Sequence, residues 1–221
     1  LSTYQLHLTF SLACDAAALT NITPDHLDRH DGFEGYSASK ARLFTMQQPW
    51  QFSVFGCADP PTCAIAEAER MRREPGRAVC ANEQRIAPLQ PDWPSLQGPH
   101  NLENAAIAVS LVEEIGLSSQ QATEGLPSFR GLAHRMERIG EHQGVMFIND
   151  SKATNPASTA PALGAFPPAP QKRIHWILGG LPKSYDLSEC EPYYGNIAAA
   201  YTIGEAGPQF ADMLEPVMHV E

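Results

Sequence analysis

A short turn in the second half of the sequence carries an unusual density of polar side chains. The stretch N-D-S-K-A-T-N, residues 149–155, follows the apolar run 145–148, where a strand is expected to end. If the strand continues, Asp150, Lys152 and Thr154 alternate and point to one side. Such a set would bind a ribose, a phosphate and a carboxylate, and a plain surface turn is the alternative.

A second polar cluster follows the first predicted strand and contains Asp25, His26, Asp28 and His30. Carboxylate and imidazole ligands suit Mg²⁺ or Mn²⁺, so the cluster is a candidate cation site, with a capped surface turn as the alternative. Lys40 lies further along the chain, in a predicted helix rich in alanine. From the residues alone it is a solvated lysine whose stem lies along apolar surface.

Three further groups suit a nucleotide or an anion. Asn101 and Asn104 share one face of a first helical turn, where their amides would read the edge of a heterocycle, although Asn101 could also be an N-cap. Arg135 lies at a predicted domain boundary, where it would bind a phosphate or form an interface salt bridge. Lys183, in G-G-L-P-K-S, follows another predicted strand and is either a ligand at the same rim or a surface lysine.

The rest of the sequence predicts the elements that would position these groups. The clearest helix runs from 98 to 115, because its apolar residues recur at three- and four-residue steps up to Gly116. The predicted helix 37–45 has an inward face made of Ala38, Ala41, Leu43 and Phe44. Other helices are predicted at 60–73, 157–165 and 208–214, and strands at 16–22, 51–56, 136–140, 145–149, 174–178 and 198–203.

This alternation predicts an α/β fold with a parallel sheet, whose ligands gather at the carboxyl ends of the strands. A change of pattern near 127–131 predicts a domain boundary. With 221 residues and 43% apolar content, the chain is long enough to bury a core. Leu1 stands where a Met would start a chain, and a strand begins at the last two residues, so we expect a piece of a longer protein.

The charge balance argues against some classes of partner. The 15 basic and 25 acidic residues give a net charge of −10, spread without a long run of one sign, so nucleic acid and anionic lipid are not expected partners. The five cysteines are odd in number and form no C-x-x-C pair, so neither a zinc site nor a disulfide framework is predicted. A reducing cytoplasm fits this usage, and neither a membrane span nor an export signal is visible.

Six ordered stretches, spread over most of the chain, together resemble the Mur ligase family of peptidoglycan precursor synthesis. They are L-S-T-Y-Q-L, N-I-T-P-D-H-L-D-R-H, S-A-S-K-A-R-L-F, G-P-H-N-L-E-N-A-A, G-L-A-H-R-M-E and I-N-D-S-K-A-T-N-P-A-S-T. Within this family, N-D-S-K-A-T-N is similar to the member that adds D-glutamate. The resemblance implies that 1–129 is part of a P-loop-type central ATPase domain and 130–221 part of a Rossmann-like C-terminal domain.

The resemblance also implies a reaction, which is ATP-dependent amide synthesis with Mg²⁺. The alanine carboxylate of UDP-N-acetylmuramoyl-L-alanine would take the γ-phosphate of ATP, and the D-glutamate amine would attack the acyl phosphate. A cytoplasmic monomer is expected. Two rivals stay open: a sister Mur ligase or folylpolyglutamate synthetase, and a non-catalytic nucleotide-binding remnant.

By the same resemblance, His26 would ligate Mg²⁺ and Lys40 would be a carbamylated lysine whose new carboxylate binds or orients metal. A lysine adds CO₂ only as the free amine, so burial and nearby cation charge must make that form accessible. Asn101 and Asn104 match adenine-side asparagines. Catalysis would require the two domains to close.

In the second domain, Arg135 matches a phosphate-reaching arginine and Asp150 a ribose-side carboxylate. Lys152, Thr154 and Lys183 match positions that face the phosphate and D-glutamate carboxylates. The positions near the nucleotide-sugar substrate are matched by Ser2 and Gln5. The sequence departs from the family where Leu181 and Pro182 replace a more usual acidic residue and glycine, and the P-loop G-x-x-G-K-[ST] is not in this chain.

Overall fold

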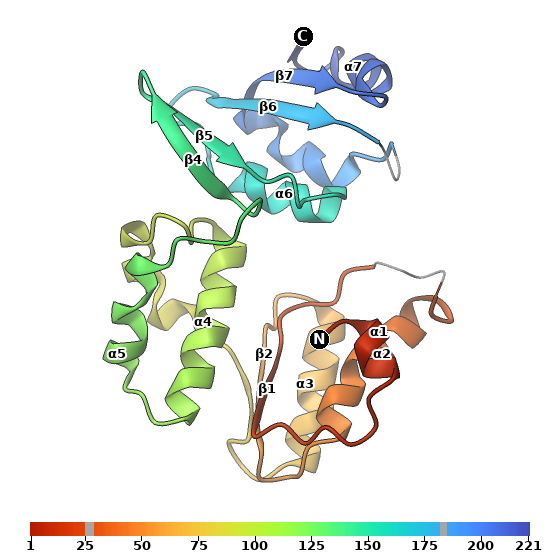
Figure 1. The fold of residues 1–221 in the computed structure, drawn as a ribbon, viewed down its shortest axis with the longest axis vertical. Helices are drawn as coiled ribbons and strands as arrows, with labels where there is room; N and C mark the ends of the chain where they lie inside the picture. Colours follow the sequence, from red (N-terminus) through yellow and green to blue (C-terminus); the bar gives the residue numbers. More distant parts are fainter. Residues whose placement is uncertain (25–28, 182–184) are drawn as a thin grey trace. The chain divides into compact units, whose positions relative to one another are not determined.

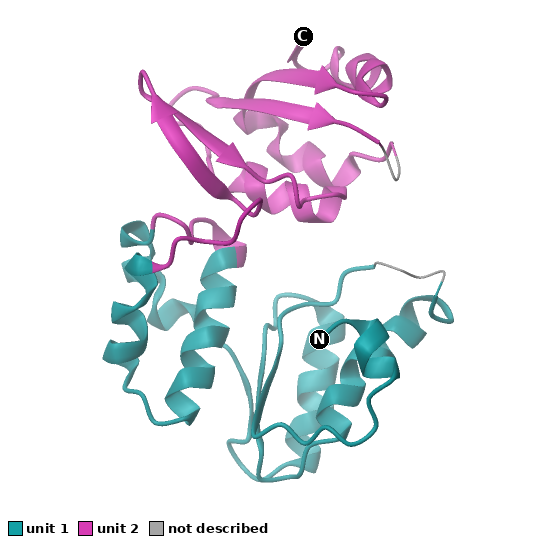
Figure 2. Ribbon diagram, in the orientation of Figure 1, with its two compact units in different colours: residues 1–93, 101–128 teal, residues 94–100, 129–221 magenta. Residues whose placement is uncertain are grey.

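The computed structural model describes residues 1–24, 29–181 and 185–221, which form two compact units (Figures 1 and 2). Unit 1 contains residues 1–93 and 101–128, and unit 2 contains residues 94–100 and 129–221. The candidate residues Asp25, His26, Asp28 and Lys183 lie outside the described residues, as does Pro182.

Unit 1 alternates short strands with helices, as the sequence predicts. Its strands are β1 (Ala16–Leu19), β2 (Phe52–Phe55) and β3 (Ala78–Cys80). Its helices are α1 (Thr3–His7), α2 (Gly32–Thr45), α3 (Pro60–Arg72), α5 (Ser119–Glu124) and most of α4 (Pro99–Glu114), with 3₁₀ turns at Glu83–Arg85, Ala87–Asp92 and Leu126–Ser128.

The sheet of unit 1 is parallel, in the order β1-β2-β3, and its two faces are covered by different helices. On one face Phe55 packs with residues of α2 and α3, among them Phe44 and Ala66. On the other face Phe52 and Val54 pack against Ile107 of α4 (Figure 1). Because both faces are buried, the strands read as continuous apolar runs.

Helix α2 differs from its prediction in length and in its inward face. It begins at Gly32 rather than Ser37. Its buried residues are Tyr36, Ser39 and Phe44, whereas Ala38 is exposed, so the prediction for Ala38 was wrong. Tyr36 lies in the additional first turn and packs in the core. Ala38 is two residues later, on the other side of the helix, and faces solvent.

A buried ion pair joins α2, α3 and the start of β2. The Arg73 side chain is fully buried, and its Nε donates to Glu69 Oε2 at 2.8 Å. Other guanidinium N–H groups donate to the backbone carbonyls of Phe44 and Gln51 and to Gln47 Oε1. Since its donors are shared among three segments, this arginine fixes their relative positions.

Unit 2 contains an antiparallel hairpin and a parallel sheet. The hairpin is β4 (Glu137–His142) and β5 (Val145–Asn149), and the sheet has the order β6-β7-β8. The remaining elements are β6 (Ile174–Gly179), β7 (Ile197–Ile203), β8 (His219–Val220), α6 (Pro156–Gly164), α7 (Gly207–Leu214) and a 3₁₀ segment at Ser188–Asn196. The predicted hairpin, helices and strands of this half are confirmed, with ends shifted by a few residues.

The core of unit 2 lies along one face of its parallel sheet. Ala200 of β7 packs there with Phe210 and Leu214 of α7, while Ile197 packs with Leu163 of α6. None of the helices in the described stretches combines the length and apolar character that a membrane span requires.

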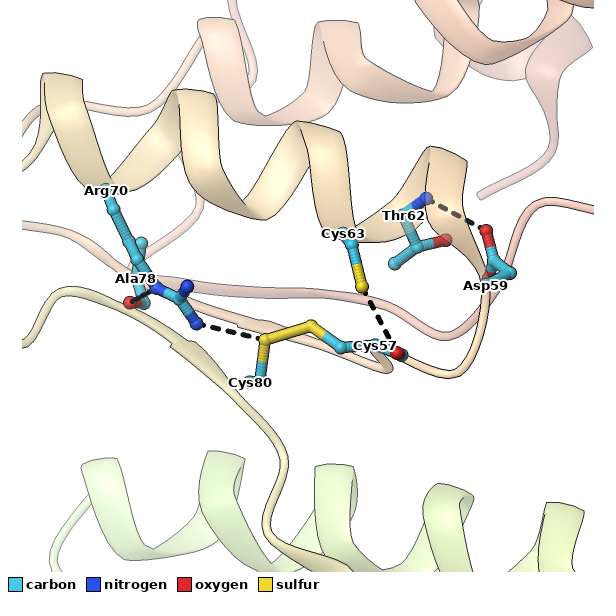
Figure 3. Close-up of a disulfide and its surroundings, with 7 residues drawn as sticks. All are labelled: Cys57, Asp59, Thr62, Cys63, Arg70, Ala78 and Cys80. Atoms are coloured by element: carbon cyan, nitrogen blue, oxygen red, sulfur yellow. Dashed lines mark hydrogen bonds between the residues drawn. A yellow bond between two sulfur atoms is a disulfide. The ribbon is translucent and has the colours of Figure 1, made fainter.

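The sequence predicted no disulfide framework, and this prediction was wrong. Cys57 and Cys80 are bonded, 23 residues apart in sequence (Figure 3). Cys80 ends β3 and Cys57 follows β2, so the pairing of two parallel strands brings together cysteines whose spacing suggests nothing. The other cysteines, Cys14, Cys63 and Cys190, are thiols, and burial raises the pKa of Cys190 to about 11.

Candidate functional site

In unit 2 two turns lie against each other at the base of the β4–β5 hairpin. His134 and Met136 both have positive φ, which bends the first turn sharply. The Lys152 N–H donates to the His134 carbonyl at 3.0 Å, and Asn149 Nδ2 lies 2.8 Å from His134 Nδ1. This arrangement brings the H-R pair of the first turn close to N-D-S-K of the second.

Asp150 is half-buried at the centre of this cluster. Its Oδ1 accepts the Met136 N–H at 2.9 Å. Burial raises the pKa of Asp150, while the hydrogen bond from Met136 and the charge of Arg135 both lower it. The carboxylate therefore lies within electrostatic reach of Arg135, and these two predicted site residues share one region.

The strand ends at Asn149, as predicted, so the condition under which Asp150, Lys152 and Thr154 would alternate along one face is not met. Strand β5 ends at Asn149, and a turn follows in which the Ala153 N–H donates to the Asp150 carbonyl at 2.8 Å. Asp150 thus packs inward while Lys152 and Thr154 are exposed, so the three side chains do not alternate along one strand face.

The two asparagines that flank the motif have structural contacts. Asn149 Oδ1 accepts the Ser151 N–H at 3.1 Å, which closes an Asx turn. Asn155 is the N-cap of α6, and its Oδ1 accepts the Ser158 N–H at 2.8 Å ahead of Pro156 at the first helical position. Within the motif, the predicted site residues Lys152 and Thr154 are exposed and suit an anion.

In unit 1 the polar groups gather at the carboxyl end of β2. A side chain at Gly56 would lie 2.6 Å from Glu103 Oε1 and 2.2 Å from the Thr20 carbonyl, so only glycine leaves room for this carboxyl group. Glu103 is 7% exposed, and its buried Oε1 has no hydrogen-bond partner among the described residues. Its carboxylate accepts the Ala58 N–H.

Burial raises the pKa of Glu103, and the negative charges of Glu83 and Asp59 add to the rise, against the Ala58 N–H. Asp59 itself has both oxygens engaged: Oδ1 accepts the Thr62 N–H at 2.8 Å and Oδ2 accepts the Ile22 N–H at 3.3 Å. The turn 57–59 therefore joins the exit of β1, the start of α3 and the first turns of α4.

The surroundings of Lys40 are aromatic. Its Nζ lies 5.2 Å from the centre of the Tyr36 ring, one turn earlier in α2. The His30 ring lies 5.5 Å from the same ring, and His30 Nε2 lies 3.1 Å from Thr3 Oγ1. Lys40 is half-buried, so its stem packs in the structure while its amine stays near the surface.

The remaining predicted residues lie at helix starts. Asn101 and Asn104 are in the first turns of α4, inside the helix, so the N-cap alternative for Asn101 was wrong. Ser2 and Gln5 form the capping box of α1: the Ser2 N–H donates to Gln5 Oε1 at 2.8 Å, and the Gln5 N–H donates to Ser2 Oγ at 3.3 Å.

Three neighbours of the candidate groups were not predicted: Glu103, Gly56 and Tyr36. Glu103 left a signal, because it is an acidic residue among the inward apolar positions of a helix. Gly56 and Tyr36 left none, since their contacts depend on tertiary packing. Among the residues that the structure describes, no three His, Cys, Asp or Glu side chains group closely enough to hold a metal ion.

Two family models match the chain. Residues 2–79 match the Mur ligase middle domain, and residues 134–221 match the Mur ligase glutamate ligase domain. The two matches fall on the halves that carry the candidate groups of unit 1 and unit 2.

Curated relatives match over the whole chain. A UDP-N-acetylmuramoylalanine–D-glutamate ligase of Novosphingobium aromaticivorans is 59% identical over 100% of this chain and 48% of its own length. The enzyme of the same name from Zymomonas mobilis is 50% identical over 97% of this chain and 46% of its own length. The chain thus spans about half the length of the curated relatives it matches.

Solved structures share the fold. The ligase MurC from Thermotoga maritima matches with a TM-score of 0.65 at 14% identity, over 99% of this chain and 52% of that one. MurF from the same organism, solved in complex with ADP, matches with a TM-score of 0.64 at 13% identity, over 100% of this chain and 55% of that one. At such identities the likeness concerns the α/β fold alone, and it confirms the predicted fold class.

Proposed function

Because this chain belongs to the Mur ligase family, we propose that the whole protein is an ATP-dependent ligase that adds D-glutamate to UDP-N-acetylmuramoyl-L-alanine. The observation that carries this proposal is the 59% identity over the full chain to a relative named for that reaction. The product would be a peptidoglycan precursor, made in the cytoplasm by a monomer. Residues 1–129 would be the later part of the central ATPase domain, and 130–221 the first part of the C-terminal domain.

The candidate residues of unit 2 would bind the phosphoryl group, the ATP ribose and the carboxylates of D-glutamate. Arg135 and Lys152 would neutralise charge on the phosphoryl group as the alanine carboxylate attacks it. Asp150, held by the Met136 N–H, would accept hydrogen bonds from the ATP ribose. Thr154, and Lys183 outside the described residues, would face the carboxylates of D-glutamate.

In unit 1, Asn101 and Asn104 would read the adenine edge, since amides offer both donors and acceptors. Their shared face on the first turns of α4 fits such a role. Ser2 and Gln5 would lie near the nucleotide sugar.

Mg²⁺ would be held by His26 and by Lys40 as a carbamate, and its chemistry would be to neutralise phosphate charge. Among the described residues the donors fit only in part, because they contain no group of three ligating side chains. The Lys40 side chain is half-buried, with its Nζ 5.2 Å from the centre of the Tyr36 ring, and carbamylation would replace the positive charge of this amine with a carboxylate that can bind the metal.

An amino-acid panel with the full-length protein tests the proposal. The protein would be supplied with ATP, Mg²⁺ and UDP-N-acetylmuramoyl-L-alanine, and phosphate release and product mass would be measured with D-glutamate, L-glutamate and other amino acids. We expect D-glutamate to give the only efficient product. Glutamylation of a folate, or preference for another amino acid, would overturn the assignment in favour of a related ligase.

A further inference from the structure

The ends of β2 and β3 are joined by the Cys57–Cys80 disulfide, beside a third sulfur and a guanidinium (Figure 3). In the strand register Cys80 lies opposite Phe55, so the bond reaches past the sheet to the turn after β2. Both cysteines are partly exposed, which gives a reductant access to the bond.

The two sulfur atoms have different electrostatic surroundings. Arg70 Nη2 lies 3.0 Å from Cys80 Sγ, and Arg70 Nε donates to the Ala78 carbonyl at 3.4 Å, which orients the guanidinium. A fixed positive charge favours a thiolate on Cys80 when the bond opens. Cys80 is therefore the better leaving group, and Cys57 Sγ the sulfur that a nucleophile attacks.

The residues that follow Cys57 connect several elements of unit 1. The Ala58 N–H donates to Glu103 of α4, and Asp59 holds the Ile22 N–H after β1 and the Thr62 N–H of α3. Cys63 Sγ donates to the Cys57 carbonyl at 3.1 Å. The disulfide adds β3 to these connections as their one covalent member.

We propose that Cys57–Cys80 is a reversible thiol–disulfide site that controls the order of the turn 57–59. The thiolate of a dithiol reductant attacks Cys57 Sγ, the S–S bond breaks, and Cys80 leaves as a thiolate that takes up a proton. The second thiol of the reductant then attacks the mixed disulfide and releases Cys57 as a thiol. Two electrons pass to the protein, and the reductant becomes a disulfide.

Reduction leaves the turn with hydrogen bonds alone, so the amides of Ile22 and Ala58 should open more often. If Asn101 and Asn104 bind adenine, ATP should also bind more weakly to the reduced protein, because Glu103 links this turn to α4. That second consequence rests on the proposed function. A disulfide in a cytoplasmic protein is expected to be regulatory rather than permanent.

The full-length protein would be equilibrated with dithiothreitol at a series of oxidised-to-reduced ratios, then alkylated and digested. We expect a cross-linked 57–80 peptide that appears and disappears reversibly with the ratio. Amide exchange at Ile22 and Ala58 should be on the order of 10-fold faster in the reduced protein. Arg70→Gln should shift the midpoint toward more reducing ratios, since the Cys80 thiolate loses its stabilising charge.

Variants separate the site from general effects. In Cys57→Ser and Cys80→Ser, the amides of Ile22 and Ala58 should exchange at every ratio as fast as they do in the reduced wild-type protein. The matched control is Cys63→Ser, whose hydroxyl can still donate to the Cys57 carbonyl. Its exchange rates should change with the ratio as those of the wild type do. Full alkylation of Cys57 and Cys80 at all ratios, a cross-link that never opens, or identical exchange in both states would each overturn the proposal.

The readouts also separate this proposal from the proposed function. A reversible cross-link with altered exchange, in a protein that ligates no amino acid, would support the disulfide site and overturn the ligase. Ligation of D-glutamate with exchange unaffected by the ratio would overturn the disulfide site and support the ligase.

Discussion

The two units hold their polar groups in opposite ways. In unit 1 the Glu103 carboxyl group is buried at the end of β2, and one of its oxygens has no hydrogen-bond partner in the part of the chain that the structure describes. In unit 2 the candidate groups lie in turns where Lys152 and Thr154 are exposed, and their supports are hydrogen bonds within the motif together with one from Met136 at the hairpin base. Changes in unit 1 should therefore disturb folding as well as function, whereas changes in the turns of unit 2 should affect function alone.

The largest expected effect is at Lys40. If Lys40 holds Mg²⁺ as a carbamate, Lys40→Ala in the full-length protein should lower the ligase rate on the order of 10³-fold, because a ligand of the ion that neutralises phosphate charge is lost. A short-chain carboxylic acid such as acetate should restore part of the rate by standing in for the carbamate. Lys172→Ala, at an exposed lysine that contacts the Tyr194 carbonyl, is the control and should retain full activity. An unchanged rate for Lys40→Ala would contradict a metal role.

The second prediction compares one ion pair from each unit. Arg73→Ala should lower the free energy of unfolding by about 3 kcal/mol, because the buried Glu69 loses one of its two arginine partners and the Gln51 carbonyl loses its donor. Arg138→Ala removes the exposed pair with Glu141 and should cost less than about 0.5 kcal/mol. Denaturant titration of both variants measures the two losses in free energy of unfolding. Equal losses would contradict the difference between the two units.

The third prediction concerns the exposed motif. Lys152→Ala should reduce kcat/KM for D-glutamate ligation on the order of 10²-fold, since one charge-assisted contact to an anion is lost. The melting temperature should not change, because the Lys152 side chain is exposed and its backbone contact to His134 is kept. Ser151→Ala is the matched control within the same turn. A stability loss for Lys152→Ala would show that the motif supports the fold.

The smallest effect is expected at Glu103. Its raised pKa, caused first by burial, means that the folded protein keeps the proton to higher pH than the unfolded chain. Its contribution to stability is therefore greatest at low pH and falls as pH rises above the ordinary value of 4.5. Glu103→Gln should be more stable than wild type by about 1 kcal/mol at pH 8 and equal to it near pH 4. Thermal unfolding at both pH values tests this. A variant less stable than wild type at pH 8 would show that the fold favours the ionised carboxylate, which contradicts a raised pKa.

The elements of the fold were largely predictable, because strands such as β2 and helices such as α4 carry strong apolar patterns. The short helices α1 and α5 were missed, although both begin with a readable capping box, Ser2 with Gln5 and Ser118 with Gln121. The 3₁₀ turns carry no comparable pattern. The disulfide was not predictable because it depends on which strands are neighbours.

The candidate site was predictable only where its contacts are local. The turn after Asn149 was predictable from the sequence, but its contacts were not, because they involve the backbone of His134 and Met136, more than ten residues away. The functional roles given to these residues remain predictions. For Glu103, an acidic residue within an apolar helix pattern could be recognised in the sequence, but its contacts with the turn after β2 could not.

The two asparagines that bound the motif also fix its length. Asn149 ties the start of the turn to Ser151, and Asn155 sets the first turn of α6. Lys152 and Thr154 therefore sit on a segment of constant span between a strand end and a helix start. An insertion there would move the whole helix or break a cap, so new specificity in this region must come from exchanging side chains at constant length.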